Sequence, residues 1–415
     1  MKLVELAIHD FDNFAASHPL RNYCQNSAYA KFMGEQGYQY DYIGYQDEIT
    51  NEIVAASLIL YKRIGSFAKY AYAPKGFLID YYNTSLMNEF IEAMIQRYIS
   101  RGIVFLKINP EIIIGELNAE KNFAGEYNQN VKIIDDLKSL KFKRRREIIP
   151  FEFLAPRISP YINLKKFNPE DLEEDFKNTL ELSKKKGLKI ENATAKEVGI
   201  YYNFIKDYTT QPINYYRNLL NIFAPIDKAD LVLVKIDHKD FLLNVRENYD
   251  IESERNNEFN RLIQEDASEE NLNLKMESDK LLLQLKNDIV EATEGLKHEE
   301  DEYVAGAIII KHLNRISILL SGFNKKFATT YPLHYLYGEL IERYKNDYDY
   351  IDLNGITSDF STTSPHYDMN IFKLGFKPDI YEFIGEFDII LNETNFKKLQ
   401  TKHAVAREMS TLRII

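Results

Sequence analysis

Side chains that could hold phosphate groups are concentrated in one stretch of the chain, between Lys132 and Lys189. This stretch carries 15 basic and 10 acidic residues, including the runs Lys141-Phe-Lys-Arg-Arg-Arg146 and Lys184-Lys-Lys186. A local excess of Lys and Arg attracts polyanions, so the stretch could bind the phosphates of a substrate. Short basic runs also occur on solvated helix faces and in surface turns, and the sequence leaves both interpretations open.

Several common catalytic motifs are absent. There is no Walker loop, no GxGxxG after a strand, no HExxH and no GxSxG, so nucleotide hydrolysis, Rossmann redox, zincin and α/β-hydrolase activities have no motif support. The eight histidines are scattered, and His312 has no second histidine at ligand spacing, so we expect no metal. The single cysteine, Cys24, excludes disulfide scaffolds and Cys-rich zinc sites and fits a reducing compartment.

A denser set of motifs lies towards the C-terminus: Tyr350-Ile-Asp-Leu-Asn-Gly-Ile356, Phe372-Lys-Leu-Gly-Phe376 and Tyr381-Glu-Phe-Ile-Gly-Glu-Phe-Asp388. Matching segments precede it along nearly the whole chain: Gln25 ahead of Gly37-Tyr38, Tyr72-Ala-Pro-Lys-Gly76, Pro156-Arg157 and Gly187-Leu-Lys-Ile190. In order and spacing the set resembles the FemA/FemB/FemX family of non-ribosomal peptidyl transferases, and most of all its FemA-like members with a helical arm. These enzymes add amino acids from aminoacyl-tRNA to the peptide of a cell-wall precursor.

The resemblance implies an enzyme, an aminoacyltransferase that moves Gly, Ala or Ser from aminoacyl-tRNA to the amino group of a lipid II-type peptidoglycan precursor. Such a reaction would build the interpeptide bridge and so serve cell wall biogenesis and cell shape. Aminoacyl-tRNA is the implied co-substrate, no cofactor is needed, and the implied acceptor is a muramyl peptide linked to a lipid or to UDP. Peripheral membrane association and homodimers or heterodimers with related enzymes are further implications.

The resemblance also assigns roles to single residues. Lys373, next to Phe372, matches the family lysine that directs a positive charge at the oxyanion of the reacting ester, and both are expected at the catalytic centre. Such electrostatic stabilisation is the largest contribution that an enzyme can make to this reaction. The expected substrate-binding residues are Lys31, Tyr72, Lys75, Gly76, Arg157, Lys177, Ser321 and Tyr337.

Three positions depart from the family pattern. Asn109 replaces an aspartate once proposed as general base, and because an Asn side chain cannot take a proton, proton removal falls to the substrate or water. Met33 and Asn178 replace a lysine and an arginine expected at the phosphates of the acceptor. Lys75, Arg157 and Lys177 could compensate, or the acceptor could differ.

The elements that would position these residues follow from charge and apolar spacing. The formal charge of −11 lies entirely within Arg246–Glu302, which holds 7 basic and 18 acidic residues. One helical stripe runs through its second half: Leu281, Leu285, Ile289, Ala292 and Leu296. With a turn at Asp266–Asn271, the pattern predicts an antiparallel coiled-coil hairpin with arms of about 20 residues. A tRNA should therefore bind away from this hairpin, and its deletion should not weaken tRNA binding.

Strand patterns flank the hairpin, at Asp230–Ile236 before it and at Val304–Ile310 and Ile316–Leu320 after it. Both halves of the chain repeat one order, in which a long helix leads into a strand: Thr84–Arg101 into Val104–Ile108, and Pro332–Lys345 into Tyr350–Leu353. We therefore expect an α/β (α+β) fold with two similar domains, which the resemblance implies are related to Gcn5-type acetyltransferases (GNAT-like). The predicted divisions are 1–150 for the first domain, 151–245 with 303–390 for the second, 246–302 for the hairpin and 391–415 for a C-terminal helix packing back on the body.

Two other functions stay open at this point. An acetyl-CoA-dependent N-acetyltransferase would need a glycine-rich loop that holds pyrophosphate at a helix N-terminus, and Ser321–Ala328 has a single Gly. A non-catalytic scaffold protein would use the hairpin to contact a partner, and the three departures would then mark a decayed site. The chain starts without a signal peptide and lacks the ~20 apolar residues of a membrane span, so we expect a cytoplasmic protein that meets any lipid-linked acceptor at the inner face of the membrane.

Overall fold

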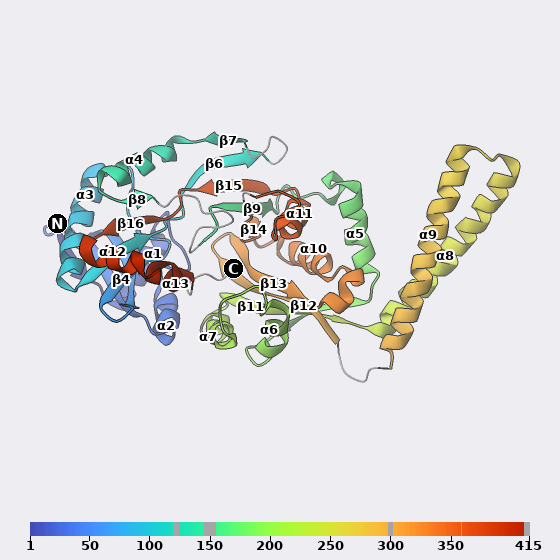
Figure 1. The fold of residues 1–415 in the computed structure, drawn as a ribbon, viewed down its shortest axis with the longest axis horizontal. Helices are drawn as coiled ribbons and strands as arrows, with labels where there is room; N and C mark the ends of the chain where they lie inside the picture. The colour runs from blue at the N-terminus through green and yellow to red at the C-terminus, as the bar shows by residue number, and fades with distance from the viewer. Residues whose placement is uncertain (119–123, 145–154, 298–301, 358, 411–415) are drawn as a thin grey trace.

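Two β-sheets covered by helices form the body of the protein, and a long helical hairpin extends from one end (Figure 1). The computed structural model describes residues 1–118, 124–144, 155–297, 302–357 and 359–410. The expected domain boundary at residue 150 lies outside the described residues, as do Arg145 and Arg146 of the basic run.

The first sheet follows the order β1-β2-β3-β4-β5-β16-β8, and its only parallel pair is β4 with β5 within the described residues. Its strands are β1 (Lys2–Glu5), β2 (Gln39–Gln46), β3 (Ile53–Ile64), β4 (Ala68–Ala73), β5 (Ile103–Ile108), β8 (Lys143–Arg144) and β16 (Phe387–Ile390). The helices of this half are α1 (Ile8–Ser17), α2 (Ser27–Glu35), α3 (Thr84–Ser100), α4 (Lys132–Ser139), α12 (Glu393–Thr401) and α13 (Ala404–Ser410), with a 3-10 turn η2 (Gln129–Val131).

The second sheet follows the order β10-β11-β12-β13-β14-β9-β15-β6-β7. Its strands are β6 (Ile113–Asn118), β7 (Ala124–Tyr127), β9 (Ile158–Asn163), β10 (Leu188–Ala193), β11 (Ala229–Ile236), β12 (Glu302–His312), β13 (Arg315–Phe323), β14 (Tyr350–Asp352) and β15 (Asp379–Phe383). The helices of this half are α5 (Glu174–Lys184), α6 (Val198–Ile205), α7 (Ile213–Phe223), α10 (Pro332–Tyr344) and α11 (Tyr367–Leu374), with 3-10 turns η3 (Pro169–Asp171), η4 (Ala224–Ile226) and η5 (Lys325–Thr330).

Each sheet contains one unit in which a long helix joins two parallel strands. In the first it is β4-α3-β5, and in the second β13-α10-β14. Helix α3 begins where the Asn83 side chain accepts a hydrogen bond from the backbone N–H of Leu86, and it buries Phe90, Met94 and Tyr98 on one face. The α/β fold with a repeated helix-to-strand order is confirmed.

Strand pairing crosses the predicted division between the halves at two places. Strands β6 and β7, from the first 150 residues, pair at the edge of the second sheet next to β15. In return, β16 from the C-terminal part pairs with β5 in the first sheet. Each half therefore completes the sheet of the other, which a division of the chain into consecutive segments does not describe.

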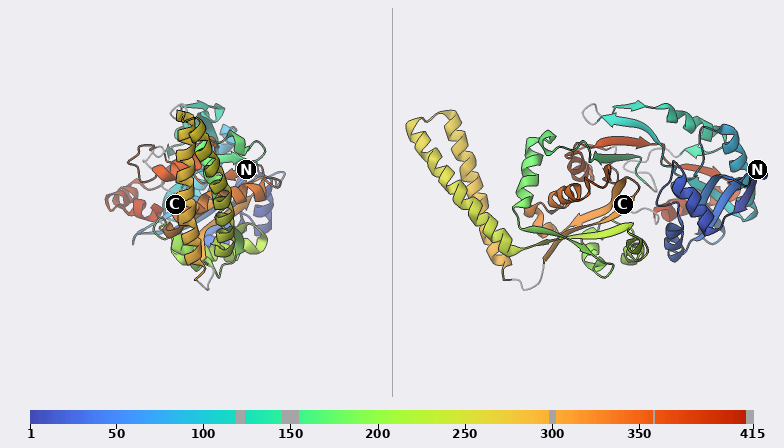
Figure 2. Two further views of the ribbon diagram at one scale, coloured as in Figure 1. Left: turned by 90° about the vertical axis from the view of Figure 1, so that its right-hand side faces the viewer. Right: turned by 180° about the vertical axis from the view of Figure 1, so that it is seen from behind.

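The hairpin consists of α8 (His238–Glu265) and α9 (Glu269–Gly295), which lie antiparallel and project away from the body (Figure 2). It is inserted between β11 and β12, which pair with each other. The turn ends where the Ser268 side chain accepts a hydrogen bond from the N–H of Asn271. Helix α8 starts eight residues before the predicted Arg246 because Phe241 and Val245 at its root are buried in the core of the second half.

The interface between α8 and α9 is only partly apolar. Leu285 and Ala292 of the predicted stripe are buried, whereas Leu281 and Leu296 are 36% and 41% exposed, so the prediction is wrong for these two residues. Polar contacts replace them: the Asn256 side chain donates to Ser278 at 2.9 Å. A buried ion pair between Lys186 and Asp288, at 2.5 Å, ties the root of α9 to the end of α5.

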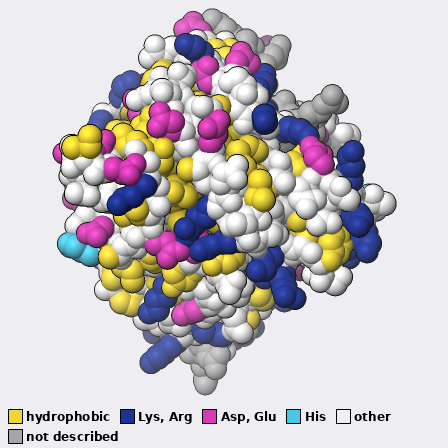
Figure 3. Space-filling model, turned by 90° about the vertical axis from the view of Figure 1, so that its left-hand side faces the viewer, with side chains coloured by type: hydrophobic (Ala, Val, Ile, Leu, Met, Phe, Trp, Pro, Cys, Tyr) yellow, Lys and Arg dark blue, Asp and Glu magenta, His cyan; other side chains and the backbone are white. Residues whose placement is uncertain are grey.

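The C-terminal segment folds back as two short helices rather than one. Phe396 and Leu399 of α12 and Val405 of α13 are buried in the core of the first half, and the ring centres of Phe396 and Phe105 are 5.4 Å apart. On the face of the molecule nearest the N-terminus, basic, acidic and apolar side chains are interspersed (Figure 3). No helix in the described part of the chain is both long and apolar enough to cross a membrane.

Candidate functional site

Lys373 lies near the end of α11 and is 7% exposed. Its amino group donates hydrogen bonds to the backbone oxygens of Gly355, at 2.6 Å, and Asn354, at 3.1 Å. Burial lowers the pKa of this amine to about 7, although the nearby carboxylate of Asp352 acts in the opposite direction. An ammonium group has three N–H donors, so one donor is left after the two carbonyls are bound.

The loop that receives Lys373 is held from its other side by Asp352. Asn354 and Gly355 both have positive φ angles, 59° and 76°, which turns their carbonyls towards the amine. The Asp352 carboxylate accepts hydrogen bonds from the N–H of Asn354 at 2.9 Å, from Ser159 Oγ at 2.8 Å and from Ser317 Oγ at 3.0 Å. A Cβ at Gly355 would lie 2.1 Å from the ring of Pro156, so only glycine fits there.

Aromatic side chains surround Phe372. Its ring centre lies 4.9 Å from that of His334, 5.0 Å from that of Tyr337 and 5.5 Å from that of Phe376. The hydroxyls of Tyr337 and Ser321 are 3.0 Å apart. Four of the residues predicted for the site, Phe372, Lys373, Ser321 and Tyr337, therefore belong to one region of the second half. Burial lowers the pKa of His334 to about 4, so its ring is neutral at pH 7.

The predicted residues of the first half meet at the end of β4. Asn109 accepts two hydrogen bonds with its amide oxygen, from Tyr72 Oη at 3.1 Å and from the N–H of Lys75 at 2.9 Å. A Cβ at Gly76 would come within 2.9 Å of the side chains of Ser57 and Gln25. Asn109 thus fixes the Lys75 loop, a function that an amide performs without any proton transfer.

Glu111 joins the two halves. Its carboxylate accepts hydrogen bonds from Arg315 on β13, at 2.5 Å, and from Asn22, at 2.9 Å, while Lys75 Nζ is 3.7 Å away. Burial alone would raise the pKa of Glu111, but Arg315 and Lys75 outweigh burial and lower it to about 2. Glu111 therefore stays ionised and is too weak a base to take a proton from an amine.

Replacing Glu111 with glutamine is expected to destabilise the protein, because Arg315 would lose its charged partner between the two halves. We expect the free energy of unfolding at pH 7 to fall by about 3 kcal/mol. The extra stability of the wild type is fully present above the ordinary carboxyl pKa, and it is lost as the pH falls from about 4.5 towards 2. Urea unfolding of both proteins at pH 7 and pH 3 measures the difference between their free energies of unfolding. An equal difference at both pH values would contradict the stabilising role of the Glu111 charge.

The other predicted phosphate-binding residues are dispersed. Lys31 is exposed on α2, beside Met33, which is buried in the core of the first half. On α5, Lys177 forms an ion pair with Glu170 of η3, which raises the pKa of Lys177, and Asn178 is exposed. Arg157 is buried just before β9. In the described part of the chain, no hydrogen bond or ion pair joins Lys31 or Lys177 to Lys75 or Lys373.

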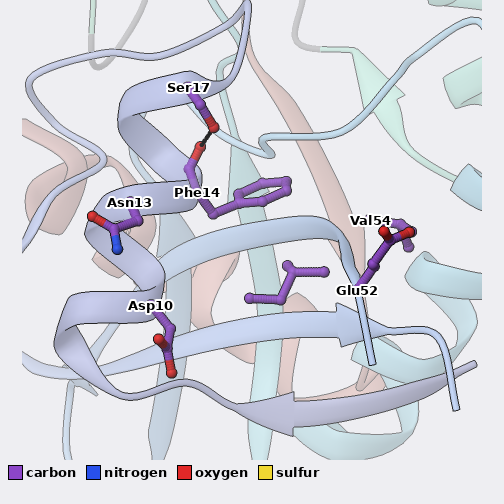
Figure 4. A pocket seen from close by; sticks show the side chains of 7 residues that line it. Asp10, Asn13, Phe14, Ser17, Glu52 and Val54 are labelled. Carbon is purple, nitrogen blue, oxygen red and sulfur yellow. Dashed lines mark hydrogen bonds between the residues drawn. The ribbon is translucent and has the colours of Figure 1, made fainter. Parts of the chain in front are cut away.

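A separate surface pocket of about 520 Å³ lies between α1 and the start of β3 (Figure 4). Asp10, Asn13, Phe14, Ser17, Glu52, Ile53 and Val54 line it. None of the predicted site residues is among them. Within the described residues, no group of three or more His, Cys, Asp or Glu side chains could hold a metal ion.

Sequence reasoning missed Asp352, Glu111, Arg315 and His334. Asp352 and Gly355 lie inside a recognised motif, and an acidic residue at the end of a buried strand is a signal that could have identified Asp352. Glu111 and Arg315 are 204 residues apart in the chain, and neither stands in a pattern that indicates the contact.

Comparisons with known proteins agree with the architecture. The chain is 21% identical, over 408 residues and 94% of both chains, to the lipid II:glycine glycyltransferase of Staphylococcus saprophyticus. It is 22% identical to the lipid II:glycine glycyltransferase of Staphylococcus aureus, with 96% of this chain and 95% of that protein covered. A crystal structure of FemX shares the fold with a TM-score of 0.72 at 19% identity, over 96% of this chain and 100% of that one. The model of the FemAB family matches residues 6–403, which confirms the predicted resemblance: the chain belongs to the FemAB family.

Proposed function

We propose that this protein transfers glycine from aminoacyl-tRNA to the amino group of a lipid II-type peptidoglycan precursor, extending an interpeptide bridge. The observation that carries the proposal is that relatives matching 94% or more of the chain are lipid II:glycine glycyltransferases. On the same ground the chain is an aminoacyltransferase, and the alternative of a non-catalytic scaffold is set aside. Alanine and serine remain the other candidate amino acids. We also propose that the two halves are domains related to Gcn5-type acetyltransferases.

The chemistry asks for charge stabilisation rather than for a strong base. The acceptor amine attacks the ester carbonyl, an oxyanion forms, the new C–N bond replaces the ester C–O bond, and the ribose oxygen leaves with a proton. Lys373 has two N–H groups engaged with the carbonyls of Asn354 and Gly355, which leaves its third donor for the oxyanion. The oxygen of Asn109 is occupied and Glu111 is strongly acidic, so the amine proton passes to the substrate or to water.

A transfer assay with the purified full-length protein tests the proposal. Glycyl-, alanyl- and seryl-tRNA are each offered with a lipid-linked and with a UDP-linked muramyl pentapeptide, and the product is identified by mass spectrometry. We expect glycine to be transferred to the lipid-linked acceptor. Absence of transfer with every donor and acceptor would overturn the proposal.

The hairpin carries the excess negative charge of the chain, and the tRNA should bind elsewhere. Because Phe241 and Leu285 at its root belong to the core, a test must remove only the tip. We expect a chain in which residues 257–276 are replaced by a short glycine-containing turn to bind tRNA as tightly as the wild type, or more tightly at low salt. Filter binding at two salt concentrations measures this, and a ten-fold loss of affinity in the folded variant would place the tRNA on the hairpin.

A further inference from the structure

We propose that a basic surface of the first half binds the face of a lipid bilayer that contains anionic lipids. This surface, called here the basic tip, combines the turn between β3 and β4 with helices α12 and α13. Its members are Lys62, Arg63, Phe67, Lys69, Lys397, Lys398, Lys402 and Arg407.

The β3–β4 turn places two positive charges directly opposite each other. Arg63 pairs in register with Lys69, one position beyond Ile64 with Ala68. Like charges on facing positions of adjacent strands repel each other, so the turn is more stable when anions approach it. Neither Arg63 nor Lys69 has an ion pair within the described residues. Between them, Phe67 is 40% exposed, whereas Tyr70 and Tyr72 on the strand that follows are buried.

The C-terminal helices add more cations beside the same turn. Lys402 Nζ lies 5.5 Å from the centre of the Phe67 ring, and Arg407 donates to the backbone oxygen of Lys402 at 3.2 Å. On α12, Lys397 and Lys398 are exposed because Phe396 and Leu399 face the core.

The carboxylates in this region do not cancel the positive charge. The turn and the segment 392–408 together hold seven Lys and Arg side chains against two glutamates. The carboxylate of Glu393 lies 3.4 Å from the amino group of Lys143, a residue that is not part of the basic tip. The carboxylate of Glu408 lies 3.9 Å from the amino group of Lys62. The turn and this segment together therefore keep a net positive charge.

An aromatic ring surrounded by Lys and Arg side chains is suited to a membrane interface. The ring enters the boundary between headgroups and acyl chains, where aromatic residues are favoured, while the cations contact lipid phosphates. Each Lys or Arg near an anionic leaflet strengthens binding about five-fold. The cations alone would suit RNA phosphates equally well, and the exposed Phe67 favours the bilayer.

The position of the basic tip also suits a lipid-linked acceptor. Phe67 directly precedes β4, and the loop Tyr72–Gly76 follows the same strand. At about 3.3 Å per residue, the strand separates the two by roughly 20 Å. A bilayer at the basic tip would therefore leave room for the headgroup and peptide of the acceptor before they reach Lys75. This last step rests on the proposed function, whereas lipid binding itself does not.

Flotation of the full-length protein with vesicles tests the inference. The vesicles contain phosphatidylcholine alone or with 40% phosphatidylglycerol. The variants are Phe67→Ser, the charge reversal Arg63→Glu with Lys69→Glu, and a control reversal of two exposed lysines on the hairpin segment, Lys280→Glu with Lys297→Glu. Both double variants change the net charge equally. We expect wild-type protein and the control to bind the anionic vesicles, with binding at least about 25-fold weaker for the tip reversal and about ten-fold weaker for Phe67→Ser.

Two further measurements, tRNA filter binding and the transfer assay, separate the possible outcomes. Filter binding of tRNA should be unchanged in the tip reversal. Failure of the wild-type protein to bind anionic vesicles, or equal losses in the tip and control reversals, would overturn the inference. Loss of tRNA binding with retained vesicle binding would assign the basic tip to RNA instead. Vesicle binding without any aminoacyl transfer would reject the proposed function and leave the membrane surface standing.

Discussion

Replacing Lys373 with methionine lowers kcat for aminoacyl transfer by about 100- to 1,000-fold and leaves KM for both substrates nearly unchanged. Methionine keeps the length of the side chain and packs against Phe372, but it cannot direct a positive charge at the oxyanion. Losing a single donor to an oxyanion has an effect of this size. Because the charge on the oxyanion exists only in the transition state, the loss should appear in kcat rather than in binding.

Single-turnover kinetics with pre-bound glycyl-tRNA isolate the chemical step from tRNA binding. The matched control is Lys345→Met, which replaces an exposed lysine that follows α10 and forms an ion pair with Glu342. Thermal unfolding monitors the fold, because the carbonyls of Asn354 and Gly355 lose their donor in the Lys373 variant. A folded Lys373→Met protein whose rate stays within ten-fold of the wild type would exclude Lys373 from the mechanism.

Local elements of the fold could be predicted because their signals are local. The apolar spacing of Phe90, Met94 and Tyr98 identifies α3, and the observed helix ends one residue before the predicted end. The turn at Ser268 was visible as a capping residue before a helical stripe. In each case the residues that decide the structure lie within one or two helical turns of each other.

Contacts between distant segments could not be predicted in this way. Nothing in the pattern of β16 shows that it leaves the second half to pair with β5, since a short apolar strand fits either sheet. The hairpin root was misplaced because Phe241 and Val245 pack against the body and not against α9. The burial of Lys373 against two carbonyls depends on the fold of the Asn354–Gly355 loop, which no spacing rule describes.

Asp352 is a positioning residue for Lys373, and its replacement by asparagine should alter the pH dependence of the reaction. The carboxylate accepts one hydrogen bond from the N–H of Asn354 in the loop and two more from the hydroxyls of Ser159 and Ser317. It is also the charged group that raises the pKa of Lys373 against the effect of burial. Without its negative charge, the pKa of Lys373 falls below about 7 and a smaller fraction of the amine is protonated at neutral pH. We expect kcat at pH 7 to fall about ten-fold or more.

The decisive measurement is the alkaline limb of the pH profile. Protonated Lys373 is the active form, so activity that depends on it is lost as the pH rises through its pKa, and in Asp352→Asn this loss should begin at a lower pH. Ser317→Ala is the matched control, since it removes one hydrogen bond from the same carboxylate and keeps the charge. A purely structural role would lower kcat in both variants without moving the limb. A shift in Asp352→Asn alone would show that the carboxylate acts on the amine through its charge, and an unmoved limb in both would remove Asp352 from this role.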